Sequence, residues 1–172
     1  MKDVAGRIRE LVPAPGDLSR EQLAELAWAI GHTPDLWRSF VRHDPEQRIW
    51  VHLYRDPHLD VWLICWDRTQ DTGYHDHDLS AGAVYIAEGT LLEDYFHRGD
   101  DGWVQERTRE RPEGSVWHFD SASIHGLRHA SGPPVVSVHC YSPALWRMGH
   151  YGPGPLGLRR ESITYADELA AG

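Results

Sequence analysis

The chain has 172 residues, of which 41% are hydrophobic and 25% charged, a composition typical of a globular protein rather than a disordered or fibrous one. Its 17 Lys and Arg residues stand against 26 Asp and Glu residues, so the formal net charge at pH 7 is −9. This charge argues against nucleic acid or an anionic membrane surface as a partner. The length predicts one domain over residues 1–172.

The cysteines and the first residues indicate the compartment. Cys65 and Cys140 lie far apart in hydrophobic stretches, a usage typical of buried thiols in a reducing compartment rather than of a disulfide framework. The first ten residues contain no apolar run like that of an export signal, and no stretch approaches the ~18 apolar residues of a membrane span. We therefore expect a cytoplasmic protein.

Residues 1–45 are predicted to be a helical segment. Ser19 and Gln22 form a capping box, the apolar residues after them recur with helical spacing, and Gly31 is placed to end the helix. A shorter helix is expected before this one, and Pro34 opens one or two further turns after it. We expect these elements to cover the rest of the domain.

From about residue 48 the hydrophobic period changes to two, which predicts β-strands. The predicted strands are 48–55, 59–66, 74–79, 83–87, 90–96, 104–109, 115–118, 124–128 and 135–141. Many short strands separated by turns indicate a sandwich or barrel, with residues 48–143 as its core. Residues 144–172 are expected to be a tail that packs on the barrel, with a Gly/Pro coil at 149–157 and an edge strand that 159–164 could add.

The candidate chemistry begins at His75-Asp76-His77. Side chains at i and i+2 of a strand face the same way, so both imidazoles would project into one cavity while Asp76 turns to the opposite face. Two neutral imidazoles that converge on one point are a natural pair of metal ligands. Taken alone in a chain with 12 His, such a pair would be better interpreted as two unrelated surface histidines.

The sequence around this pair resembles the first motif of the cupin superfamily. That motif places a carboxylate five residues after the second His and a glycine seven residues further on, and these positions hold Gly82 and Gly89 here. The spacing is kept and the carboxylate is missing. The resemblance implies an all-β, jelly-roll-like cupin barrel, to which the predicted helices add an N-terminal cover.

The second cupin motif runs from a glycine to a third histidine, and Gly114 and His125 stand at its spacing, with Asp and Ala replacing the usual Pro and Gly between them. His118 and His129 are rivals for the third ligand, but neither stands at the motif's spacing. The resemblance implies these metal ligands: His75, His77 and His125.

Loss of the carboxylate changes the charge of such a centre. A ferrous ion held by two His and one carboxylate has a net charge near +1, whereas three neutral His leave about +2. The more positive Fe(II) suits an anionic ligand such as a thiolate, whose sulfur would then lie beside dioxygen. The expected product is a sulfinic acid.

A further motif lies at residues 137–143, where period two places Ser137, His139 and Tyr141 on one face of a strand. Ser-x-His-x-Tyr-Ser-Pro, together with the Leu-Ile-Cys-Trp segment at 63–66, resembles the cysteine dioxygenase family of thiol dioxygenases. The resemblance implies a relay in which Tyr141 positions dioxygen or the substrate sulfur while His139 and Ser137 orient its hydroxyl. In animal members a Cys beside the site is crosslinked to this Tyr; Gly82 stands there in this chain, so we predict no crosslink.

Substrate recognition in this family uses an Arg that binds the substrate carboxylate, and both Arg48 and Arg55 are candidates here. If Arg48 faces inward, alternation brings Trp50 and Tyr54 inward with it. An aromatic wall of this kind could accept a heteroaromatic or quaternary-ammonium thiol. Trp62 and Trp66 would either join that wall or belong to the core. The core is the preferred interpretation because their strand is apolar on both faces.

The predicted function is therefore oxidation of a small thiol by O2 at a non-haem Fe(II) centre. Cysteine, 3-mercaptopropionate, cysteamine and a thiol-imidazole such as ergothioneine remain alternative substrates. Zinc, nickel or manganese would also suit three His ligands and would indicate another reaction. A non-catalytic cupin that binds or senses a small ligand is the alternative from another class. The sequence predicts no oligomeric state.

Overall fold

The computed structural model describes residues 3–169 of the chain, so residues 1, 2 and 170–172 of the predicted domain lie outside the described residues. The helical elements are α1 (Val4–Leu11), α2 (Arg20–Gly31), the 3-10 turns η1 (Pro34–Leu36) and η2 (Arg38–Phe40), and α3 (Ala166–Leu169). The strands are β1 (Ile49–Arg55), β2 (Asp60–Trp66), β3 (Tyr74–His75), β4 (Ala81–Glu88), β5 (Thr90–Gly99), β6 (Gly102–Gln105), β7 (Arg109–Pro112), β8 (Val116–Phe119), β9 (Ile124–His129), β10 (Val135–Ser142), β11 (Arg147–Gly154) and β12 (Gly157–Tyr165).

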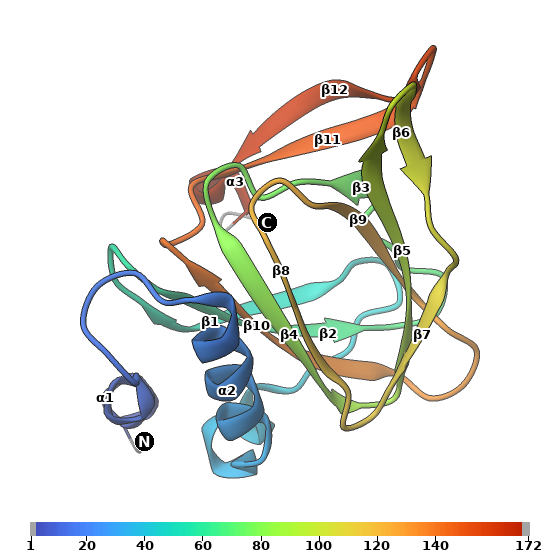
Figure 1. Cartoon of the computed structure of the whole chain (residues 1–172). Helices are drawn as coiled ribbons and strands as arrows, with labels where there is room; N and C mark the ends of the chain where they lie inside the picture. The colour runs from blue at the N-terminus through green and yellow to red at the C-terminus, as the bar shows by residue number, and fades with distance from the viewer. Residues whose placement is uncertain (1–2, 170–172) are drawn as a thin grey trace.

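The strands form two antiparallel sheets that curl into a barrel (Figure 1). One sheet has the order β1-β2-β10-β4-β8, and the other has the order β12-β11-β3-β9-β5-β6, with β7 also paired to β5. Helix α2 lies against the outer face of the first sheet, where it contacts β4 and β10 (Figure 1). The predicted all-β barrel with an N-terminal helical cover is confirmed.

Two strands of the first sheet, β2 and β10, are buried on both faces. Side chains on their outer face, such as Leu63 and Val138, pack with the helices in one apolar cluster. Those on the inner face, such as Ile64 and Tyr141, pack in a second cluster inside the barrel. The predicted alternation along these strands is confirmed, and it separates the polar inner residues of β10 from the helical cover.

The cover begins as the sequence predicts. Ser19 accepts a hydrogen bond from the backbone N–H of Gln22 while the Gln22 side chain accepts from the Ser19 N–H, which completes the capping box. The apolar face of α2 is fully buried, and a Cβ at Gly31 would lie 2.1 Å from the ring of Tyr85 on β4. Glycine at this position therefore lets the helix approach the sheet closely.

The structure corrects three predicted strands or loops. The strand expected over 74–79 is limited to Tyr74–His75, because a turn follows in which Asp78 has a φ of 54°. The strand expected over 104–109 is divided between β6 and β7. The Gly/Pro coil expected at 149–157 is largely strand β11, which pairs with β12 and β3. Pairing on both sides overrides the low strand propensity of these residues.

The edge strand expected at 159–164 is confirmed within β12, which lies at one end of its sheet. Both cysteines are buried free thiols, as expected. Among the described residues, no helix has the length and apolar character required to cross a bilayer.

Candidate metal centre

Three histidines converge inside the barrel. His75 of β3 lies directly opposite His125 of β9 in the sheet register, and His77 follows β3 by two residues. One ring nitrogen from each side chain lies within 4.8 Å of those of the other two. All three side chains are buried. The structure thus brings the predicted ligands together, although only His75 of the first pair lies within a strand.

The hydrogen bonds of these rings fit a bound metal ion. Nδ1 of His75 lies 3.2 Å from the Gly73 carbonyl, and Nδ1 of His125 lies 3.0 Å from a Glu93 carboxylate oxygen. In each ring Nε2 is therefore the nitrogen left to coordinate a metal ion. His77 is buried with neither ring nitrogen hydrogen-bonded to a residue of the described chain. A buried polar group without a partner is costly, and a metal ion at this point would supply one.

The protonation states also suit metal binding. Burial, reinforced by the charge of the neighbouring histidines, lowers the pKa of His75 and of His77 well below their usual value. The rings are therefore neutral at physiological pH, the form in which imidazole ligates a metal. These two ligands could bind a metal ion without first losing a proton.

These pKa values predict the acid sensitivity of the metal-free protein. Burial lowers the pKa of His139 to about 3 and those of His75 and His77 well below 6.5, so below about pH 6.5 the unfolded chain binds protons that the folded chain does not. As the pH falls, each histidine should therefore lower the free energy of unfolding by about 1.4 kcal/mol per pH unit, over the range between its pKa in the unfolded chain and its pKa in the folded chain. For His139 this range extends from about pH 6.5 down to about 3.

Chemical denaturation after chelator treatment, at pH 7.5 and 5.5, measures this loss. His118 is exposed, so His118→Ala should show the same decrease in the free energy of unfolding between the two pH values as the wild type. His77→Leu should show a smaller decrease. A free energy of unfolding that rises on acidification over this range would contradict the assigned burial.

The rival third ligands lie elsewhere. His118 is exposed on β8, and Nε2 of His129 bonds the Pro133 carbonyl. The position of the missing cupin carboxylate is closed by packing, since a Cβ at Gly82 would lie 2.4 Å from the Phe119 ring. That ring stacks on His77 with centroids 4.7 Å apart. Phe119 therefore fills the space in which a carboxylate or a crosslinking cysteine would have to stand.

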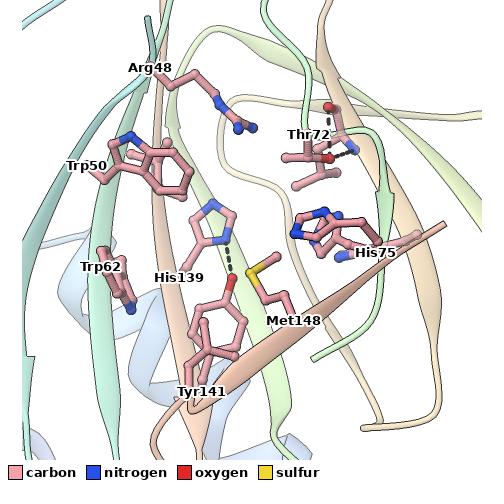
Figure 2. A pocket seen from close by; sticks show the side chains of 13 residues that line it. Arg48, Trp50, Trp62, Thr72, His75, His139, Tyr141 and Met148 are labelled. Carbon is pink, nitrogen blue, oxygen red and sulfur yellow. Dashed lines mark hydrogen bonds between the residues drawn. The ribbon is translucent and has the colours of Figure 1, made fainter. Parts of the chain in front are cut away.

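A chain of hydrogen bonds runs along the inner face of β10 beside the histidines. The Ser137 hydroxyl lies 2.8 Å from Nε2 of His139. Nδ1 of His139 lies 3.1 Å from the Tyr141 hydroxyl (Figure 2). The Tyr141 ring lies 5.1 Å from that of His77, measured between centroids. Trp66 extends the chain, because its Nε1 donates to the Ser137 hydroxyl at 2.8 Å. Trp66 is fully buried, in agreement with the preferred interpretation of it as a core residue, but the sequence did not predict this hydrogen bond.

A cavity of about 50 Å³ lies between this series of hydrogen-bonded side chains and the histidine cluster. Arg48, Trp50, Trp62 and Met148 are among the residues that line it (Figure 2). The Arg48 guanidinium lies over the ring of Trp50 at 4.8 Å and over that of Trp66 at 5.1 Å. It forms no hydrogen bond or ion pair with any residue that the structure describes, and burial lowers its pKa.

Arg55 has a different environment. Its guanidinium pairs with the buried Asp60 at 3.1 Å and donates to the Leu145 carbonyl, also at 3.1 Å. It does not line the cavity. Of the two arginines that the sequence left as alternatives, the structure brings only Arg48 to the cavity.

Tyr54 does not face inward with Arg48 and Trp50, contrary to the expected alternation. The register of β1 against β2 shifts between His52 and Tyr54, and such a bulge reverses the face on which later residues lie. Tyr54 consequently packs in the apolar cluster beneath the helices, and its hydroxyl donates to Asp56 at 2.6 Å. The inward aromatic wall is formed by Trp50 and Trp62 instead.

Together, the fold and the site define the class of protein: a cupin-type β-barrel with a candidate metal centre of three histidines. Solved structures share the fold. A protein from Thermus thermophilus has a TM-score of 0.53 at 19% identity, covering 62% of this chain and 93% of its own. A cupin superfamily protein of Desulfitobacterium hafniense has a TM-score of 0.51 at 9% identity, covering 62% and 86%.

The family follows from the sequence comparison. The family model described as cysteine dioxygenase type I matches residues 3–152, and the chain belongs to this family. Human cysteine dioxygenase type 1 is 23% identical over 149 residues, covering 80% of this chain and 72% of the human protein. The zebrafish (Danio rerio) protein of the same name is 23% identical over 151 residues, covering 76% and 72%.

Proposed function

We propose that this protein is a thiol dioxygenase that converts a small thiol and O2 into the sulfinic acid, with Fe(II) held by His75, His77 and His125. Membership of the cysteine dioxygenase family supports a thiol dioxygenase in general. The observation that carries the proposal is the hydroxyl of Tyr141, which ends a buried hydrogen-bond chain beside the three clustered imidazoles. When bound, Fe(II) supplies the charge that favours a thiolate and the redox chemistry that activates O2.

The direction of the hydrogen-bond chain follows from its first member. An indole N–H is only a donor, so Ser137 accepts from Trp66. Its own proton has two acceptors in reach, and we assign it to Nε2 of His139 at 2.8 Å because the Ile64 carbonyl is farther away, at 3.5 Å. His139 then carries its proton on Nδ1 and donates it to the Tyr141 oxygen. The Tyr141 hydroxyl proton is left to point into the cavity.

Tyr141 keeps that proton because burial raises the pKa of its hydroxyl well above the usual value. The residue is therefore a neutral hydrogen-bond donor at physiological pH. We infer that it orients O2 or the substrate sulfur and holds a proton at the Tyr141 oxygen, within reach of the reacting atoms. His139 and Ser137 keep the hydroxyl in this orientation.

Arg48 is the residue that we propose to bind a substrate carboxylate. Its guanidinium lines the cavity and forms no hydrogen bond or ion pair with a described residue, although the charge of Asp71 acts on it at longer range. The guanidinium lies over two indole rings. A guanidinium that is desolvated in this way gains from a bidentate carboxylate. Trp50 and Trp62 provide the adjoining aromatic wall, which supports a thiol-imidazole as the second candidate substrate.

Replacing Arg48 with alanine should raise the KM for a carboxylate-bearing thiol by about tenfold to a hundredfold, which corresponds to the loss of a charged hydrogen-bond pair of roughly 1.5–3 kcal/mol. The KM for cysteamine, which has no carboxylate, should change little. Arg55→Ala is the matched control and should leave both values unchanged because its partners are Asp60 and Leu145. An unchanged KM in Arg48→Ala would place carboxylate recognition elsewhere.

Oxygen consumption by the iron-loaded protein against cysteine, 3-mercaptopropionate, cysteamine and ergothioneine tests the proposed function. We expect uptake of one O2 per thiol consumed for at least one of them. Binding of a thiol without uptake would instead indicate a non-catalytic cupin, and activity only with another metal would refute the iron assignment. A cytoplasmic location, where small thiols stay reduced, fits this reaction.

A further inference from the structure

A carboxylate that the sequence motifs do not include lies behind one of the three histidines. Glu93 on β5 is buried, and one of its oxygens lies 3.0 Å from Nδ1 of His125. The two residues face the same side of neighbouring strands, since His125 is paired with Tyr95, two positions along β5. Glu93 and His125 therefore stand beside each other on one face of this sheet, with the carboxylate at Nδ1 of the ring.

The same carboxylate is fixed by two further donors. Trp117 Nε1 donates to the oxygen that receives His125, at 2.8 Å, and Arg111 Nε donates to the other oxygen at 2.9 Å. The Arg111 guanidinium is itself stacked over the Trp117 ring at 4.4 Å. The carboxylate plane is held in a single orientation by three donors, His125, Trp117 and Arg111. An ion pair with Arg111 alone would not need the other two hydrogen bonds.

We propose that Glu93 is a positioning residue of the metal centre: it fixes His125 in the form protonated at Nδ1, so that Nε2 faces the metal. An ionised carboxylate can only accept a hydrogen bond, so its contact with His125 requires a proton on Nδ1. A carboxylate behind a ligating imidazole also makes that imidazole a more basic ligand.

This arrangement returns a carboxylate to a centre whose motif lacks one. The motif position, Gly82, is closed by the ring of Phe119, so no acidic side chain can enter the ligand set there. Glu93 acts instead through His125, and its ion pair with Arg111 balances its charge. The centre therefore keeps the higher positive charge of three neutral ligands while one of them becomes a better donor.

The first test reads the tautomer of His125 in the metal-free protein by long-range 1H–15N spectra of labelled histidine, with His125→Ala for assignment. Wild type and Glu93→Gln should show Nδ1–H, because a Gln oxygen can still accept from His125. Glu93→Leu should lose the fixed tautomer. The matched control is Asp94→Asn, a neighbouring buried carboxylate that bonds Arg128 and Thr108 and faces away from the histidines.

The second test measures Co(II) affinity by competition with a chelator. Glu93→Leu should bind Co(II) about 10–100-fold more weakly, the usual effect of removing such a partner, while Glu93→Gln should lose several-fold and Asp94→Asn less than twofold. The proposal would be overturned if Glu93→Leu kept the wild-type tautomer of His125 and bound Co(II) as tightly as Asp94→Asn does. If Glu93→Leu does not fold, an unchanged Co(II) affinity in Glu93→Gln overturns it.

This inference rests on the metal centre of the proposed function and not on its thiol chemistry. A wild-type protein that binds no Co(II) would overturn both the centre and the role of Glu93. A protein that shows the predicted Glu93 effects but oxidises no thiol would overturn the proposed reaction alone.

Discussion

Replacing His77 with alanine is expected to abolish both metal binding and thiol oxidation. His77 is fully buried and neither of its ring nitrogens has a partner among the described residues, so a bound metal ion would supply the polar interaction that these nitrogens lack. Loss of one of three ligands should weaken Fe(II) or Co(II) binding by more than the roughly 10–100-fold typical of an outer hydrogen-bond partner. Metal content after dialysis and oxygen uptake measure the two effects.

His118→Ala provides the matched control, because His118 is exposed on β8 and was a rival ligand by sequence. It should retain full metal content and activity. In the metal-free protein, His77→Ala should lower the free energy of unfolding only by the amount expected for the loss of ring packing. The deleted nitrogens made no hydrogen bond with a described residue, so no hydrogen bond is lost. Full iron occupancy in His77→Ala would remove this residue from the centre.

Tyr141→Phe is expected to retain the metal and to lower turnover by about 10²–10⁴-fold, the range of a positioned proton donor. The ring that packs 5.1 Å from His77, measured between centroids, is preserved, so the metal ligands should not move. Only the hydroxyl that receives the hydrogen bond from His139 is lost. Steady-state kinetics at saturating thiol and metal analysis of the same sample separate the two effects.

Tyr85→Phe is the control for this substitution. Tyr85 is a buried tyrosine of β4, but it faces helix α2 on the outer side of the sheet. Its variant should turn over at the wild-type rate. Turnover by Tyr141→Phe that equals this control would discard the role assigned to the hydroxyl, and loss of the metal would show that Tyr141 supports the ligands instead.

The polar face of β10 shows how much of the site periodicity alone can predict. Ser137, His139 and Tyr141 alternate with apolar residues on a strand that is central in its sheet. The register against β4 shifts between Val136 and Ser137 and is regular from Ser137 onward, so the period of two is kept over these three residues. Their hydrogen-bond chain follows directly from this alternation. Many short strands with turns between them predicted a sandwich or barrel, and the resemblance to the cupin motifs implied the jelly-roll form. The helical cover was predictable because its main helix has a capping box and apolar residues at helical spacing.

Features that depend on other strands escaped prediction. The bulge that turns Tyr54 away from the cavity is visible only in the pairing of β1 with β2, since no Gly or Pro marks it. Strand β11 is rich in Gly and Pro and forms because β3 and β12 pair with it on both sides. Glu93 reaches His125 from an adjacent strand; an acidic residue within the apolar run of β5 was the one available signal.

The fate of 18O2 during turnover tests the central claim most directly. With the iron-loaded protein and its best thiol, the product should be the sulfinic acid carrying two 18O atoms, as shown by its mass. Unlabelled water should contribute no oxygen to the product within the reaction time. A disulfide, or a sulfinic acid whose oxygens come from water, would contradict a dioxygenase built on three neutral histidines.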